Sequence, residues 1–212
     1  ELPLSRYMGS PYGWMVARTG WDADSVIVEM KVNVFNFNNH QHLDAGAFQV
    51  YYKGPLAVDS GLYGGKGESA YGGAHYMNYM KRTVAHNGML VHDPAEQFTA
   101  GKRSYANDGG QKFVNDNREP ASLEQLQRDY RTADVLGQGF GPDPQKPAYT
   151  YLKGDVTRAY GGKVKQAQRS FVFLNLAPGK VRAALVVFDR VVSSDPGFRK
   201  YWLLHSMEEP RI

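Results

Sequence analysis

Short runs of alternating apolar and polar residues recur along this chain, and little of it has helical periodicity. In the clearest run, Ser25–Val34, β-branched residues alternate with polar ones, which is typical of a strand with one buried face. Similar runs cover 14–19, 48–53, 148–153, 155–160, 168–174, 182–192 and 200–207. About ten short strands with long loops predict an all-β fold, a multi-stranded antiparallel β-sandwich with at most one or two short helices.

Glycine and proline mark the connections between these runs. Loops are expected over 61–73, which holds six glycines, over the polar stretch 93–117, and over 137–147. Gly161-Gly162 and Pro178-Gly179 occupy hairpin positions. Ser122-Leu-Glu-Gln125 has the spacing of a capping box and predicts one short helix near Ser122–Tyr130.

The composition limits the class of protein. With 42% hydrophobic and 22% charged residues, the 212-residue chain is typical of a soluble globular domain. It has no cysteine, so disulfides and thiolate metal sites are excluded. No apolar run approaches the roughly 18–20 residues of a membrane span, and no signal peptide opens the chain. The net charge of +4 mildly favours an anionic partner, although a slightly basic surface explains it equally well, and no nucleic-acid partner is expected.

The stretch from Asn39 to Asn87 holds the residues with the clearest chemistry. His40 and His42 are two apart, so on an extended chain both imidazoles point to the same side. Asp59 ends a second extended run and His86 opens a third, and three neighbouring strands of one sheet would bring these groups together.

Two imidazoles and a carboxylate make a zinc shell with a fourth position open for water or a further ligand. A nitrogen-rich site accepts several metals, and availability and tetrahedral preference favour zinc. His75 and His92 are rival third ligands, and each histidine has a structural role in a strand as its alternative.

Several motifs in the chain resemble the β-sheet domain of heparinase II/III-like polysaccharide lyases, most closely the heparinase II branch. The resemblance covers most of the chain, from about Gly13 to the end. It rests on the segments 39–46 (NHQHLDAG), 52–63 (YKGPLAVDSGLY) and 82–87 (RTVAHN), and on the later segments 151–158 (YLKGDVTR), 187–190 (VFDR) and 201–206 (YWLLHS).

This resemblance implies roles for individual residues. A zinc ion would be held by His42, Asp59 and His86, and it is expected to act mainly as a structural ion. His40 would be catalytic, with a tyrosine on a separate N-terminal (α/α) toroid as its partner. No such helical domain is expected within residues 1–212, which are interpreted as a single β-sandwich domain, an interior piece of a longer protein.

Further residues are candidates for substrate contact, each with a structural role as the alternative. Tyr63 and Tyr71 would contact the sugar. Arg82 would bind a carboxylate or sulfate, as would Lys81, Arg158 and Arg169, unless these are solvated charges at strand edges.

The expected function is a polysaccharide lyase that cleaves a uronic-acid-containing anionic polysaccharide, of the heparin or heparan sulfate type, by β-elimination. An alginate-type lyase or a uronate C5-epimerase would share the abstraction of the C5 proton. A non-catalytic β-sandwich that binds carbohydrate or supports another domain is the alternative from a different class. The resemblance implies a secreted or periplasmic location, and a homodimer is open.

Overall fold

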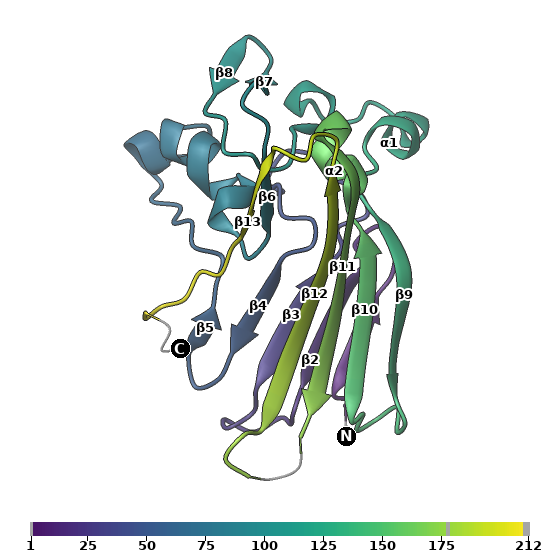
Figure 1. The fold of residues 1–212 in the computed structure, drawn as a ribbon. Helices are drawn as coiled ribbons and strands as arrows, with labels where there is room; N and C mark the ends of the chain where they lie inside the picture. The colour runs from purple at the N-terminus through teal and green to yellow at the C-terminus, as the bar shows by residue number, and fades with distance from the viewer. Residues whose placement is uncertain (1, 177–178, 210–212) are drawn as a thin grey trace.

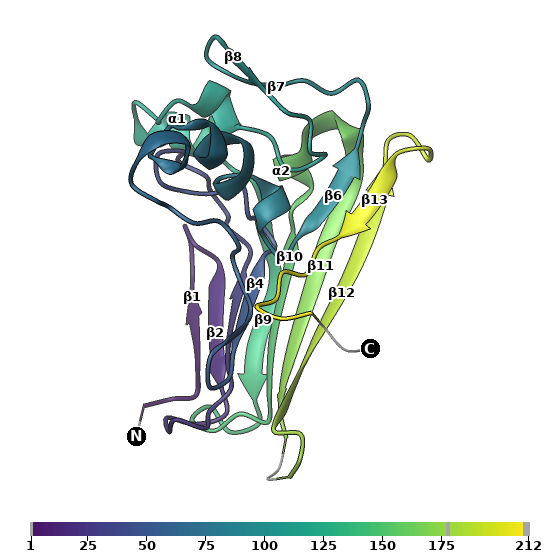
Figure 2. The same cartoon turned by 90° about the vertical axis from the view of Figure 1, so that its left-hand side faces the viewer.

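A computed structural model, which describes residues 2–176 and 179–209, contains two antiparallel sheets packed face to face (Figures 1 and 2). The first sheet is a meander in sequence order: β1 (Ser5–Met8), β2 (Trp14–Arg18), β3 (Ile27–Lys31), β4 (Phe48–Tyr51) and β5 (Pro55–Ala57). The second has the order β12 (Ala183–Ser193), β11 (Val164–Asn175), β10 (Tyr149–Asp155) and β9 (Asp134–Gly141). The predicted all-β sandwich is confirmed.

Smaller elements gather at one end of the sandwich, the upper end in Figure 1. They include two strand pairs, β6 (Met89–His92) with β13 (Arg199–Trp202) and β7 (Phe98–Ala100) with β8 (Arg103–Tyr105). The helical elements in the described residues are α1 (Leu123–Asp129), α2 (Thr157–Tyr160), the 3₁₀ turns η1 (Gly67–Ser69), η3 (Thr83–Ala85), η4 (Val114–Asn117) and η5 (Gly161–Lys163), and the π-helical turn η2 (Tyr76–Met80). None of the helices described is long and apolar enough to cross a membrane.

The alternating pattern of the strands produces the core between the two sheets. Met15 of β2 pairs with Met30 of β3, and both side chains are fully buried. Leu152 of β10 and Phe171 of β11, which are register partners, are fully buried in the opposite sheet and belong to the same core cluster. Burial of each such side chain stabilises the fold by about 1.5–3 kcal/mol, so the core holds the sheets rigidly below the end that carries the loops.

The segment 155–160 is not the separate strand expected from the sequence. Asp155 ends β10 and Thr157–Tyr160 form α2, because the chain turns at the end of β10 and is tied to β11 by hydrogen bonds instead of pairing along it. The amide of Val156 donates to the carbonyl of Ala167 at 2.8 Å, and the amide of Ala167 donates to Thr157 Oγ1 at 2.9 Å. Gly161 follows with φ of +64°, a left-handed conformation that favours glycine. Of the second predicted hairpin turn, Pro178 lies outside the described residues.

The loop predicted over 137–147 is wrong in its first part, because β9 runs through three glycines. Gly139 is the register partner of Tyr151, and Gly141 is the register partner of Tyr149. A Cβ added at Gly137 or Gly141 would lie 3.4–3.5 Å from the nearest tyrosine atom. Gly137 and Gly141 therefore lie against tyrosine side chains of β10, and the alternate spacing of the three glycines fits a strand here, not a loop.

The other local predictions have mixed outcomes. The polar stretch 93–117 is not all loop, since it contains the hairpin of β7 and β8. The predicted helix is confirmed as α1, and Ser122 Oγ accepts a hydrogen bond from the amide of Gln125 at 3.1 Å. The side chain of Gln125 returns to the amide of Ala121 and not to that of Ser122, so the capping box is reciprocal only in part.

Candidate metal centre and neighbouring histidine

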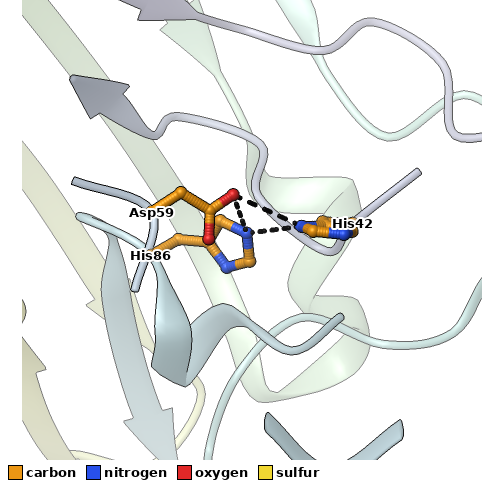
Figure 3. Close-up of side chains that lie close together, drawn as sticks. All are labelled: His42, Asp59 and His86. Carbon is orange, nitrogen blue, oxygen red and sulfur yellow. Dashed lines mark hydrogen bonds and ion pairs between the residues drawn. The ribbon is translucent and has the colours of Figure 1, made fainter. Parts of the chain in front are cut away.

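The structure brings His42, Asp59 and His86 together at the loop-bearing end of the sandwich (Figure 3). His42 Nδ1 lies 2.9 Å from His86 Nε2 and 3.4 Å from Asp59 Oδ2, and His86 Nε2 lies 3.2 Å from the same oxygen. The three atoms thus form a small triangle (Figure 3). The rivals His75 and His92 do not belong to this group of close ligand atoms.

The expectation that three neighbouring strands carry these residues is wrong. His42 lies in the connection between β3 and β4, Asp59 follows the end of β5, and His86 caps η3 just before β6. Loops place the ligands because the inner faces of the strands are occupied by the apolar core.

The loops that carry Asp59 and His86 are tied to each other. The amide of Ser60, next to Asp59, donates to the carbonyl of Ala85, next to His86, at 2.9 Å. The C-terminal segment adds a second tie, because the amide of Val58 donates to the carbonyl of His205 at 3.0 Å and the amide of His205 donates to Asn87 Oδ1 at 2.6 Å. Both ligand loops are therefore clamped by residues distant in sequence.

A buried arginine fixes the same loops to the second sheet. Arg169 of β11 forms a two-pronged ion pair with Asp189, at 2.6 and 2.8 Å. Its Nη1 also donates to the carbonyls of Gly46 and Asn87, at 2.7 and 2.9 Å. Gly46 belongs to the loop of His42 and Asn87 follows His86, so one guanidinium holds both backbones. Arg169 is therefore not a solvated strand-edge charge.

Backbone contacts orient His86, which is almost fully buried. Its Nδ1 lies 2.8 Å from the carbonyl oxygen of Arg82, which can only accept, so Nδ1 carries a proton and Nε2 faces the other two groups. Burial lowers the pKa of His86, but the hydrogen bond to Asp59 and nearby carboxylate charges outweigh it, and the pKa is raised overall.

Asp59 is ionised in this environment. Burial raises its pKa, but hydrogen bonds and charge interactions with His42 and His86 outweigh it and lower the pKa well below its usual range. Asp59 Oδ2 faces both imidazoles, whereas the buried Oδ1 has no hydrogen-bond partner among the described residues. An orphaned carboxylate oxygen beside two converging imidazole nitrogens fits a cation at this position, and this donor set suits Zn²⁺.

His40 lies on the same loop as His42 but points to a different neighbour. The stretch is not extended, since the amide of Gln41 donates to the carbonyl of Asn38 at 2.9 Å and closes a turn. Asn38 and Asn39 both have positive φ, at +68° and +46°. The His40 ring packs against Tyr71, with ring centroids 4.8 Å apart, whereas His42 meets His86.

The turn that carries His40 is anchored on both sides. The side-chain amide of Asn38 donates to the carbonyls of Val114 and Arg118, in and after η4. On the other side, Asn39 accepts hydrogen bonds from Tyr71 Oη at 3.1 Å and from Lys81 Nζ at 3.0 Å. The imidazole of His40 therefore stands on a backbone held by several distant segments.

Some of the residues predicted to contact substrate are exposed, and others are buried. Tyr63 and Tyr71 are exposed, at 59% and 50%, and Arg158 is also exposed. Arg82 is completely buried, with its guanidinium against Asp108 and the ring of Phe98. The structure therefore does not support direct contact between Arg82 and a substrate, and it shows that Arg82 is not a solvated edge charge.

His205 lies in the segment 201–206, and the sequence predicts no role for it. Burial lowers its pKa, and the charge of His86 lowers it further, so the ring is neutral and lies close to the centre. Its position next to the metal centre depends on the pairing of β13 with β6, which no local pattern reveals.

The sequence of this chain matches a known protein family, and its fold is similar to those of solved structures. Residues 8–207 match the family model described as heparinase II/III-like, C-terminal. The fold is similar to the crystal structure of heparan sulfate lyase HepC from Pedobacter heparinus, with a TM-score of 0.53 and 16% identity, over 90% of this chain and 22% of that one. A heparinase III gene product gives a TM-score of 0.51 and 17% identity, over 91% and 23%. At such identities the likeness shows the fold alone, and no curated protein sequence matches the chain.

Proposed function

Because the chain belongs to the heparinase II/III-like family, as its C-terminal domain, we propose that it is the β-sandwich half of a lyase that cleaves uronic-acid-containing anionic polysaccharides by β-elimination. The observation that carries the proposal is His40, held on an anchored turn beside Tyr71 and two residues from the His42–Asp59–His86 centre. The named structural neighbours, a heparan sulfate lyase and a heparinase III, favour a heparan sulfate-type polymer as substrate.

The chemistry requires removal of a weakly acidic proton. His40 takes the proton from C5 of the uronate, and the C5–H electron pair forms a double bond between C4 and C5. The bond from C4 to the linking oxygen breaks, and this oxygen leaves with a proton from a tyrosine. A neutral imidazole suits the role of base near pH 7, and cationic groups near the uronate carboxylate would stabilise the enolate-like transition state.

His42, Asp59 and His86 would hold a zinc ion through the three atoms that converge in this structure. When bound there, the ion would tie three loops together and hold the backbone that carries His40. The proton on His86 Nδ1 and the ionised state of Asp59 leave both side chains ready to act as ligands.

The chain spans 22% and 23% of the lengths of the two similar structures described above. We therefore propose that the complete protein also contains the N-terminal (α/α) toroid that the family resemblance implies, and that this toroid supplies the tyrosine acid. Polymers of this kind are processed outside the cytoplasm, which favours a secreted or periplasmic protein.

The test is turnover by the full-length protein on heparan sulfate, chondroitin, hyaluronan and alginate, followed by the ultraviolet absorbance of the unsaturated uronate. A rise with one polymer is expected, and it should vanish in His40→Ala while zinc content and thermal unfolding stay as in the wild type. His75→Ala is the matched control and should keep full activity.

Other outcomes would favour the alternatives. Exchange of the C5 proton with solvent without chain cleavage would indicate an epimerase. Binding of a polymer that survives His40→Ala, with no reaction on any polymer, would indicate a non-catalytic carbohydrate-binding domain.

A further inference from the structure

A pocket of about 340 Å³ opens beside the turn that carries His40. Its lining includes Tyr71, Tyr76, Lys81, Arg103, Asn117 and Arg118. Tyr71 connects the pocket to His40, because its ring contacts the imidazole at 4.8 Å and the Tyr76 ring at 5.0 Å, measured between centroids. A group bound in this pocket would therefore be separated from His40 by the ring of Tyr71.

Lys81 is a buried cation, and no carboxylate of the described residues lies within ion-pair distance of it. Only 1% of the residue is exposed, and its Nζ donates to two neutral oxygens, Asn39 O at 3.0 Å and Asn117 Oδ1 at 2.9 Å. Glu119 acts on it only from beyond ion-pair distance. Burial lowers the pKa of Lys81 to about 8, so it is still charged at neutral pH.

Two other lysines with little exposed side-chain surface, by contrast, each form an ion pair with a carboxylate. Lys163 forms an ion pair with Glu96, and Lys31 forms one with Asp44 at 3.2 Å. A buried charge without a partner of opposite sign is costly, and among the described residues Lys81 Nζ has acceptors for two of its three protons. Because Lys81 lines the pocket, an anionic ligand bound there would supply the negative charge that Lys81 lacks nearby.

Two arginines add positive charge to the same pocket. Arg103 makes no ion pair with any carboxylate of the described residues, and Arg118 lies 3.7 Å from Asp116. Asp116 is the one carboxylate in the lining, and it also accepts a hydrogen bond from the amide of Gly101. Three cations therefore face a single engaged carboxylate.

A second pocket, of about 580 Å³, includes His40 itself and has a different character. Its lining has one charged residue, Glu119, together with Phe37, Pro120 and Leu126. Asn39 lines this second pocket, and its carbonyl also accepts the hydrogen bond from Lys81. The turn that carries His40 therefore lies between a cationic pocket and a mainly apolar pocket. This asymmetry gives a bound polymer a preferred position for its anionic groups.

We propose that the pocket around Lys81 is a subsite for an oxyanion, a sulfate or a carboxylate, on the sugar next to the one that reacts at His40. The proposal rests on the proposed function for its substrate. Lys81 supplies a fixed point charge, while Arg103 and Arg118 supply planar groups that match sulfate and carboxylate oxygens.

The test measures binding of a heparan sulfate oligosaccharide by calorimetry, on the full-length protein in the His40→Ala background, so that the ligand is not cleaved. The same oligosaccharide is also used after desulfation and after reduction of its carboxylates, which separates the two sources of the anion. Arg103→Ala/Arg118→Ala should lose about tenfold or more in affinity, because it removes the two planar cations that would pair with the oxyanion. Arg6→Ala/Arg128→Ala is the control, since it removes the same charge from exposed positions outside the pocket.

The decisive result is the comparison across ligands. One of the two ligand modifications should weaken binding to the parent protein and have no further effect on Arg103→Ala/Arg118→Ala. Lys81→Met should show the same insensitivity, with thermal unfolding as the check on its fold. The subsite would be overturned if the control variant lost as much affinity as the pocket variant. It would also be overturned if desulfation and carboxylate reduction weakened binding to the pocket variants as much as to the parent protein. If the variants show this ligand dependence but the wild type cleaves no polymer, the proposed lyase activity is refuted and the proposed subsite is retained.

Discussion

His86 donates its Nδ1 proton to the backbone carbonyl of Arg82 at 2.8 Å, and this contact sets the direction of its other nitrogen. A backbone acceptor holds the tautomer whatever side chain occupies position 82. Nε2 is thereby presented to His42 and Asp59, at 2.9 and 3.2 Å. The geometry of the centre is thus built into the main chain around η3.

Zinc should stabilise the wild-type protein and not Asp59→Asn. An ion present at a thousand times its dissociation constant stabilises the folded state by about 4 kcal/mol, and the asparagine removes the charged ligand while keeping its shape. Thermal unfolding with zinc and after chelation measures the difference. His75→Ala, which alters a histidine outside the centre, should behave as the wild type, and a full zinc response in Asp59→Asn would refute the ligand assignment.

Arg169→Met should lower the free energy of unfolding by about 3–5 kcal/mol, because it removes the cationic partner of the partly buried Asp189 and leaves the carbonyls of Gly46 and Asn87 without their donor. Urea denaturation measures this loss. Arg158→Met, at an exposed arginine, should change stability by less than about 0.5 kcal/mol. Similar values for the two variants would show that Arg169 does not fix the loops.

Lys81 should make stability depend on pH above neutrality. Burial lowers its pKa to about 8 in the folded state, against 10.5 for a free lysine, so the unfolded state binds more protons between these values. The stability of the wild type relative to Lys81→Met should therefore rise by about 1–3 kcal/mol from pH 7 to pH 10. Urea denaturation at both pH values tests the sign, and a flat difference would mean that Lys81 is not desolvated.

Gly61→Ala should disturb the metal centre without removing a ligand. A Cβ at Gly61 would lie 2.8 Å from Met80 Cα, a backbone atom that cannot simply rotate away. The loop that carries Asp59 would have to move, with a cost of about 1–3 kcal/mol and weaker zinc binding. Zinc titration compares this variant with Gly162→Ala, where the added Cβ meets nothing within 4 Å. Equal zinc affinities would show that the loop adapts.

The sequence predicted the fold wherever alternation alone decides the structure. Met30 lies on the inner face of β3 because Glu29 and Lys31 flank it, and every second residue of β2, Met15 and Ala17, is likewise buried. The pattern failed at β9, where the glycines predict a loop but the chain pairs with β10, and at 155–160, where the predicted strand is replaced by the end of β10 and by α2. Both failures depend on contacts with another strand.

The residues of the candidate site could be predicted, but not the elements that carry them. Residue types and motif resemblance identified His42, Asp59 and His86, whereas the loops that hold them depend on Arg169 and on the segment around His205. The burial of Arg82 could not be foreseen either, because its partner Asp108 lies in a distant polar stretch.

The pairing of β6 with β13 has a consequence for the order of folding. β13 is synthesised about a hundred residues after β6, and the segment that follows it provides the ties to Val58 and Asn87. Closing so long a loop is slow, because its entropy is lost before the distant contacts form. The metal ligands therefore reach their final spacing only when this late segment docks. Metal capture would then be a closing event in the maturation of the domain and not its nucleus.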